Sequence, residues 1–170
     1  MPTTPTYWKS SFLANAGATA GAQFLAQTIG LANGNILTLW QDETTGPGEG
    51  YDIVGTIFAP DGVATAISVF QVNTAFVADD QDSPKAVALP DGGFVVVYGA
   101  EYDEEIGFLT LAIERYDASG VSVATNLITD AGGKLGPWTI SATPAGDYTV
   151  VFTRDRGTAA LARSPSAPPI

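Results

Sequence analysis

A strand–turn–strand pattern recurs three times in this chain and constrains the fold more than any single residue does. Its copies lie 58 and then 54 residues apart, at Leu31–Trp40, Leu89–Tyr98 and Thr143–Phe152. Each copy places Gly at the fourth position and a run of β-branched or aromatic residues after it. Repeats of about this length indicate arrays of one supersecondary unit, so the fold is predicted unit by unit.

The second unit predicts four antiparallel strands. They cover 85–89, 94–98, 108–117 and 121–129, and Gly92, Gly93 and Gly120 lie in the turns between them. Gly suits these turns because it adopts positive φ without steric cost. The intervening stretch Gly99–Gly107 is predicted to be an acidic loop.

The first unit predicts the same plan at the same offset. Its four expected strands are 28–31, 35–40, 51–59 and 63–72. Val, Ile, Thr and aromatic residues are common, while Leu and Lys are sparse, which favours strands over helices. The predicted fold class is therefore all-β, with four-stranded antiparallel units that resemble propeller blades.

The third unit is predicted to be assembled from both ends of the chain. Strands at 138–143 and 148–154 would pair with N-terminal strands at 7–15 and 22–27. The expected domain is residues 1–163, with units at 28–74, 83–130, and 138–156 joined with 7–27. Residues 164–170, rich in Pro and Ser, are predicted to be a disordered tail.

Two ways of closing this array remain open from the sequence. Three sheets of one chain could surround a pseudo-threefold axis, as in a β-prism or β-trefoil. Alternatively, two chains could form a six-bladed propeller, because propellers usually have 4–8 blades. Self-association, or contact with neighbouring structural proteins, is the partner prediction.

Composition excludes several kinds of chemistry. The formal net charge is −11, which disfavours binding to nucleic acid or to an anionic lipid surface. The chain has no Cys and no His, so disulfides, thiolate catalysis and a Ser-His-Asp triad are impossible. No basic and apolar leader opens the chain, and no apolar run reaches membrane-spanning length, so no membrane insertion is expected.

Three motifs resemble a repeat found in large bacterial cell-surface and calcium-dependent secreted proteins. They are Leu-Pro-Asp-Gly-Gly-Phe-Val-Val-Val-Tyr at 89–98, Arg-Tyr-Asp-Ala-Ser-Gly at 115–120 and Phe-Gln-Val-Asn-Thr at 70–74. The resemblance implies an all-β, propeller-like module with a non-enzymatic structural or adhesive role. The expected setting is extracellular, cell-surface or virion, without an N-terminal signal peptide. The alternatives are a carbohydrate-binding, lectin-like module and a phage or phage-like particle component.

Acidic clusters are candidate calcium sites. Asp79, Asp80 and Asp82 lie between the first two units, and Ca²⁺ takes 6–8 oxygen ligands. The alternative interpretation is a solvated, charge-rich loop, since no EF-hand spacing is present. Paired carboxylates could also serve a glycosidase, but loop acids are rarely buried enough to act as a general acid, so no enzyme activity is predicted.

Aromatic residues divide into two groups. Trp40, Tyr98 and Phe152 occupy one repeat position and are predicted to form a core layer. Other aromatic residues lie nearer to loops and are the candidates for ligand contacts: Trp8, Tyr51, Tyr102 and Trp138.

Overall fold

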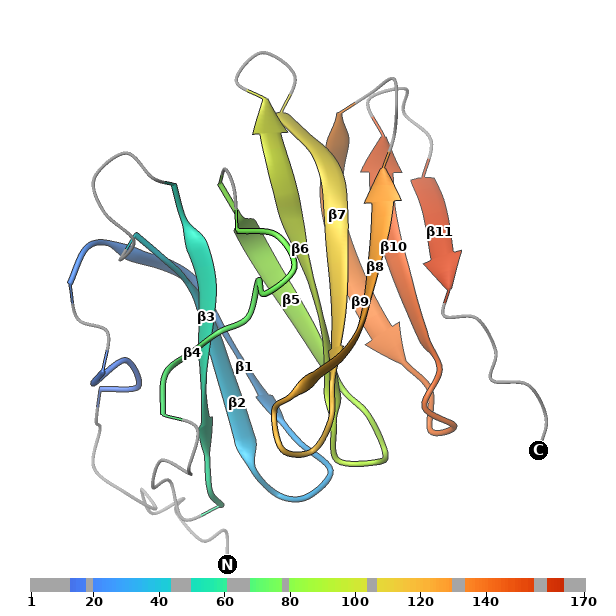
Figure 1. Ribbon diagram of the computed structural model, residues 1–170. Helices are drawn as coiled ribbons and strands as arrows, with labels where there is room; N and C mark the ends of the chain where they lie inside the picture. Colours follow the sequence, from blue (N-terminus) through green and yellow to red (C-terminus); the bar gives the residue numbers. More distant parts are fainter. Residues whose placement is uncertain are drawn as a thin grey trace, which may run out of the picture.

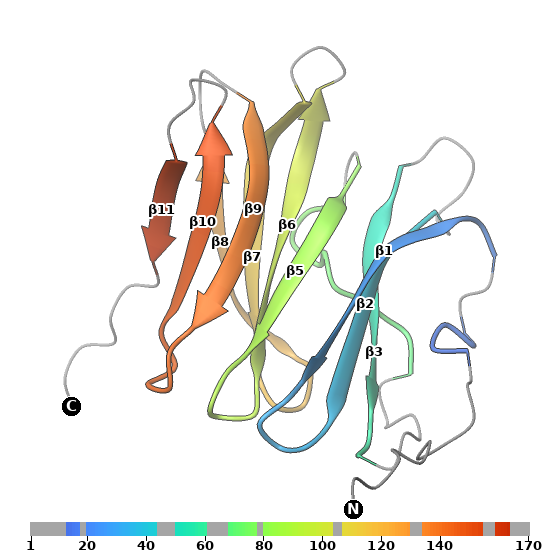
Figure 2. The same ribbon diagram turned by 180° about the vertical axis from the view of Figure 1, so that it is seen from behind.

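The computed structural model describes an all-β chain in three antiparallel sheets. It describes residues 13–17, 20–43, 50–60, 68–77, 80–103, 107–129, 134–154 and 159–163, with only the backbone at 101–103, 107–109 and 159–163. No helix occurs in these ranges, and hence none that could cross a membrane. Figures 1 and 2 show the three sheets standing side by side.

The first two sheets have four strands each, in sequence order. The first contains β1 (Gln23–Gly30), β2 (Ile36–Asp42), β3 (Asp52–Phe58) and β4 (Phe70–Gln71). The second contains β5 (Asp82–Ala88), β6 (Phe94–Asp103), β7 (Gly107–Tyr116) and β8 (Ser122–Thr129). The third has three strands, β9 (Leu135–Ala142), β10 (Tyr148–Arg154) and β11 (Ala159–Arg163), in the order β11-β10-β9.

The hairpin turns of the predicted repeat have the same backbone geometry in all three copies. The turns at Gly34, Gly92 and Gly146 have φ values of 87°, 89° and 94°, and all three close with the same pair of backbone hydrogen bonds. Positive φ is the reason that Gly occupies this position in every copy. The predicted all-β, antiparallel class is confirmed.

A second shared feature is a bulge in the first strand of each four-stranded sheet. Register shifts fall between Phe24 and Gln27 in β1 and between Asp82 and Lys85 in β5, 58 residues apart. Leu25 and Ser83, inside these bulges, both have φ of 52°, which is uncommon for residues other than Gly.

The predicted assignment of residues 22–27 to a split third unit is wrong. Residues 22–27 do not pair with the third sheet, because 23–27 belong to β1, which runs through its bulge into the predicted first strand of unit one. The third sheet is completed by β11, which pairs with β10. Residues 7–12 and the tail 164–170 lie outside the described residues.

Two other boundaries differ from the prediction. β6 extends to Asp103 and β7 begins at Gly107, so the expected acidic loop 99–107 is largely a continuation of one long hairpin. Within the described residues, the fourth strand of the first unit is only Phe70–Gln71, shorter than the predicted 63–72. The prediction for β10, 148–154, is confirmed.

Two hydrophobic cores hold the sheets in a row. One lies between the first and second sheets and includes Leu37, Leu39, Phe94 and Tyr98; the other lies between the second and third. The second sheet is therefore covered on both faces, which explains why the run Phe94–Tyr98 is completely buried rather than alternating. The β-prism and β-trefoil alternatives would gather three sheets around one shared core, and the described residues form two.

The crossing from the first sheet to the second is held by the 70–74 motif. Val72 is fully buried, and the Asn73 amide donates to Asp52 Oδ1 and to Gln81 Oε1 at 2.7 Å each and to the Phe76 carbonyl oxygen at 2.8 Å. Asn73 Oδ1 accepts from the Ile53 N–H at 3.0 Å. One fully buried side chain thus satisfies the backbone and side chains of both flanking segments.

Thr74 continues this connection into a buried polar cluster centred on Glu114 of β7. The fully buried Glu114 carboxylate accepts from the hydroxyls of Thr74 at 2.7 Å, Tyr98 at 2.5 Å, Tyr116 at 3.0 Å and Ser122 at 3.3 Å. The Tyr116 hydroxyl also contacts the carbonyl oxygen of Val72. The Glu114 cluster therefore joins three strands of the second sheet to the linker from the first.

We expect Glu114→Ala to destabilise the protein by about 3 kcal/mol, because it leaves several buried hydroxyls without their acceptor. Chemical unfolding monitored by circular dichroism measures this. Asp147→Ala is the matched control, since Asp147 is exposed in a turn, and its effect should stay within about 0.5 kcal/mol. Equal effects of the two substitutions would contradict the role assigned to Glu114.

Alkaline pH should weaken the fold through Tyr98 and Tyr116. Burial, together with the nearby Glu114 carboxylate, raises the pKa of both phenols above their ordinary value near 10. Their contribution to stability is complete below pH 10 and falls above it, where the unfolded chain loses protons that the folded chain retains. The free energy of unfolding should fall by about 1.4 kcal/mol per pH unit for each phenol. Tyr98→Phe/Tyr116→Phe should flatten this slope in urea titrations; an unchanged slope would refute the assignment.

Candidate functional site

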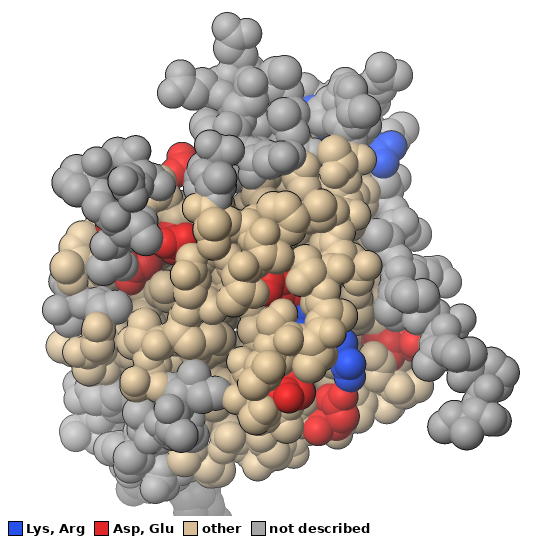
Figure 3. All heavy atoms as spheres, viewed as in Figure 1, with Lys and Arg blue, Asp and Glu red and all other residues tan. Residues whose placement is uncertain are grey.

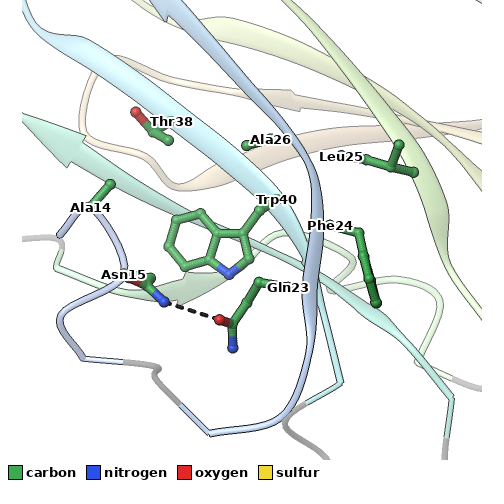
Figure 4. Close-up of a pocket in the computed structure, with 8 residues that line it drawn as sticks. All are labelled: Ala14, Asn15, Gln23, Phe24, Leu25, Ala26, Thr38 and Trp40. Carbon is green, nitrogen blue, oxygen red and sulfur yellow. Dashed lines mark hydrogen bonds between the residues drawn. The ribbon is translucent and has the colours of Figure 1, made fainter.

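The candidate site is a pocket of about 270 Å³ on the outer face of the first sheet, facing away from the second sheet. We call it the Trp40 pocket. Its lining residues come from segment 13–17, β1 and β2: Ala14, Asn15, Gln23, Phe24, Leu25, Ala26, Thr38 and Trp40. Figure 4 shows the indole of Trp40 at its centre, with Asn15 and Gln23 beside it.

Strand alternation decides which side chains reach this pocket. In β2, Leu37 and Leu39 point into the core shared with the second sheet, so Thr38 and Trp40 point to the opposite face. The β1 bulge then adds one residue opposite β2 and brings the consecutive residues Phe24, Leu25 and Ala26 to the lining. Phe24 and Leu25 are 48% and 54% exposed, whereas Trp40 is 3% exposed. The pocket therefore has a buried aromatic floor and an exposed apolar rim.

Polar groups of the pocket are bonded to one another. The Asn15 amide donates to Gln23 Oε1 at 3.1 Å, and Gln23 Nε2 donates to the Ala20 carbonyl oxygen at 2.7 Å. The hydroxyls of Thr28 and Thr38 lie 3.2 Å apart. These bonds fix the wall of the pocket and hold segment 13–17 against the first sheet.

Below the pocket, the Trp40 indole N–H donates to Asp42 Oδ2 at 2.8 Å. Asp42 is completely buried, and its other carboxylate oxygen, Oδ1, accepts no hydrogen bond from the residues that the structure describes. An unpaired buried carboxylate oxygen is costly, so its presence beside the pocket is a distinctive feature of this site.

Comparison of the two units shows how the pocket arises. Asn15 and Gln23 stand 58 residues before Asn73 and Gln81, and the same amide–amide hydrogen bond joins each pair. Around this shared bond, every polar member of the Glu114 cluster is replaced in the first unit. The replacements are Ala16 for Thr74, Trp40 for Tyr98, Thr56 for Glu114, Phe58 for Tyr116 and Ala64 for Ser122.

Of the residues predicted to bind a ligand, the described side chains are those of Tyr51 and Trp138, and these two lie beside different sheets. Tyr51 packs edge-to-face on Phe24, with ring centroids 6.0 Å apart, and so lies at the rim of the pocket. Trp138 of β9 is half-buried against the second core and donates to the Ser83 carbonyl oxygen at 3.1 Å. The side chain of Tyr102 and all of Trp8 lie outside the described residues.

The acids predicted to bind calcium are placed in part. Asp80 Oδ1 accepts from the Tyr51 N–H at 3.0 Å, and Asp82 Oδ1 accepts from the Ser83 hydroxyl at 3.0 Å. Asp79 lies outside the described residues. Within the part of the chain that is described, no three acidic residues gather into a group suited to a metal ion. Calcium binding stays a prediction.

Trp40, Tyr98 and Phe152 are 3%, 0% and 2% exposed, so each is buried as predicted. They do not form one shared layer, because Tyr98 belongs to the first core, Phe152 to the second, and Trp40 to neither. The sequence reasoning missed Asn15, Gln23 and Asp42 as site residues. A signal for the first two was available, because both recur at the repeat offset of 58. Asp42 has no such signal, since Ala100 stands at its equivalent position.

Comparison with known proteins identifies the fold but no family. No protein-family model and no curated protein matches the chain. Among solved structures, an endo-arabinase from Bacteroides thetaiotaomicron VPI-5482 is similar, with a TM-score of 0.50 and 12% sequence identity. The match covers 81% of this chain and 54% of that one, so the chain spans about half the length of the enzyme. At this identity the likeness concerns the fold.

We expect Trp40→Phe to destabilise the protein by about 3 kcal/mol, because it removes the one hydrogen bond that the described residues donate to the buried Asp42 carboxylate. Trp138→Phe is the matched control. It removes an indole N–H from the neutral carbonyl acceptor of Ser83, and about 1 kcal/mol is expected. Urea unfolding of both variants measures the difference, and equal losses would contradict a special contribution from Asp42.

Proposed function

We propose that this chain is a non-catalytic, adhesive recognition module that binds carbohydrate in the Trp40 pocket. The proposal is based on the different residues that the first and second units have at equivalent positions. The second unit fills this place with the Glu114 cluster, whereas the first unit has an open pocket with an indole floor. At this position the first unit has a cavity where the second unit has buried hydrogen bonds. The first unit is therefore less stabilised there but has room for a ligand.

The lining of the pocket suits a sugar ring. Saccharides offer C–H groups that pack on aromatic rings and hydroxyls that pair with side-chain amides. Trp40 and the rim residue Phe24 supply aromatic surface, and the Asn15–Gln23 pair supplies amide atoms. Its volume of about 270 Å³ is small, which matches one or two sugar rings better than a long chain.

The fold neighbour supports the same class of ligand. An endo-arabinase acts on a carbohydrate, and its fold is the one that this chain resembles. Hydrolysis at the Trp40 pocket lacks support, because a glycosidase needs two carboxyl groups flanking the scissile bond and none of the described lining residues is acidic. Binding without catalysis is therefore the function that the pocket favours.

The packing of the three sheets in a row also supports a recognition module built on a propeller-like scaffold. Face-to-face packing of successive four-stranded sheets, with β5 beside both β1 and β9, is how propeller blades pack. The third sheet turns Thr139, Ser141 and Thr153 outward, and all three are exposed. This end face is rich in hydroxyls.

A structural role through self-assembly is the second candidate. The observation that favours it is the outer strand β8 with the residue before it, where three large apolar side chains are about half exposed: Val121, Val123 and Leu127. Contiguous exposed apolar residues on an edge strand are typical of an assembly surface. This surface lies on the second sheet, away from the Trp40 pocket.

We expect neutral oligosaccharides, such as arabinotriose and cellotriose, to bind at the Trp40 pocket with a Kd of roughly 1 mM, the scale for one well-packed sugar ring. Ala26→Phe, which fills the pocket from its exposed rim, should weaken binding by at least about tenfold. Isothermal titration against a neutral glycan panel measures both.

Ala124→Phe is the matched control, because Ala124 is an exposed strand residue on β8. It should bind as the unchanged protein does. If no glycan binds and light scattering shows oligomers that Leu127→Lys disperses, the assembly role replaces the recognition role.

A further inference from the structure

We propose that the Trp40 pocket selects an amino sugar, a saccharide ring that carries a protonated amine. This inference rests on the proposed function and names the class of saccharide. It comes from charged groups beneath the pocket, which the packing of the sheet does not use.

The first observation is the uncompensated carboxylate of Asp42. It is fully buried, and Oδ1 accepts no hydrogen bond from any described residue. Within the described part of the chain, no Lys or Arg forms an ion pair with it, and the ion pair that is present, Arg115–Asp91, lies on the second sheet. Buried charges are normally paired, and no Lys or Arg among the described residues pairs with this carboxylate.

A second acid lies directly opposite. Asp42 and Asp52 are register partners in β2 and β3, and Asp52 is 8% exposed. Like charges at opposed positions of a sheet repel each other. The side chains that approach Asp52 are neutral amides, Gln71 at 3.1 Å and Asn73 at 2.7 Å, so neither carboxylate meets a basic side chain there. The electrostatic potential at this end of the first sheet is therefore negative.

Trp40 connects the negatively charged Asp42 to the pocket. Its indole N–H donates to Asp42 at 2.8 Å while its ring forms the floor of the cavity. Donation to a carboxylate increases the electron density of an indole ring, and the face of Trp is already the best aromatic surface for a cation. An ammonium group in the pocket gains mainly from the carboxylate behind the ring, because Trp40 itself is 3% exposed.

The wall of the pocket has an acceptor for the same group. Gln23 Oε1 accepts one hydrogen bond from Asn15, and an amide oxygen has two lone pairs. A sugar ammonium can donate to the second lone pair while the C–H groups of its ring lie on Phe24 and Trp40. Uronic acids and sulfated sugars place a negative charge there and are disfavoured.

The net charge of the chain acts in the same direction. The formal net charge is −11, and Figure 3 shows several separate groups of acidic side chains with few basic ones on one face of the molecule. This field is screened at a Debye length of about 10 Å at 0.1 M salt, whereas buried charges are screened much less. Added salt should therefore weaken the attraction of a cation to the whole surface and leave its attraction to the buried Asp42 largely unchanged.

The test compares glucosamine trimer with N-acetylglucosamine trimer and arabinotriose by isothermal titration at about pH 6, where sugar amines are protonated. Glucosamine trimer should bind about tenfold more tightly than the two neutral trimers. The preference should persist in 0.5 M NaCl. Asp42→Asn should reduce it to less than about twofold.

Asp147→Asn is the control for loss of one acidic charge, because Asp147 is exposed in a turn of the third unit. It should keep the preference. Thermal unfolding establishes that Asp42→Asn folds; if it does not, loss of the preference in Trp40→Phe, which keeps an aromatic ring without the N–H, serves as the readout.

The outcomes distinguish this inference from the proposed function. Equal binding of charged and neutral trimers overturns the amino-sugar selectivity and leaves carbohydrate binding intact. A preference that 0.5 M NaCl abolishes, or that Asp42→Asn retains, assigns the selectivity to the general surface charge and also overturns the inference. Absence of binding by any trimer overturns both.

Discussion

The side chain of Asn73 is the interaction on which the arrangement of the sheets depends. It accepts from Ile53 of β3 and donates to three groups, so the chain leaving the first sheet is fixed before it enters the second. Thr74 then reaches Glu114, which ties the same linker to β7. A linker with this many buried hydrogen bonds behaves as part of the core, and it sets the relation of two sheets that share no strand.

The Trp40 pocket is the altered counterpart of that arrangement. Asn15 and Gln23 preserve the amide pair of Asn73 and Gln81, which keeps segment 13–17 in the equivalent place. With Thr56 in the place of Glu114 and Ala16 in that of Thr74, the hydrogen bonds that bind the linker tightly to the second sheet have no counterpart in the first. The repeat thereby provides both a rigid frame and, at one end of the row, a cavity.

Much of the fold was predictable because repeats impose the same local chemistry at each copy. The turn glycines Gly34, Gly92 and Gly146, the hairpins and the all-β class follow from residue type and spacing. The third unit was not predictable in this way. Its last strand, Ala159–Arg163, has a sequence rich in Ala with little strand signal, and it forms because it pairs with β10. The β1 bulge likewise disrupted the strict alternation that strand prediction uses, so one strand was interpreted as two.

The sequence by itself determined the unit: its hairpin, its turns, its acidic character and the aromatic residue that each copy buries. Only the tertiary structure decided how the units stack and what lies on each face of a sheet, because these depend on contacts between residues far apart in the chain. Trp40 illustrates the division. Its burial follows from the repeat, whereas its bond to an unpaired carboxylate and its place under segment 13–17 follow from packing.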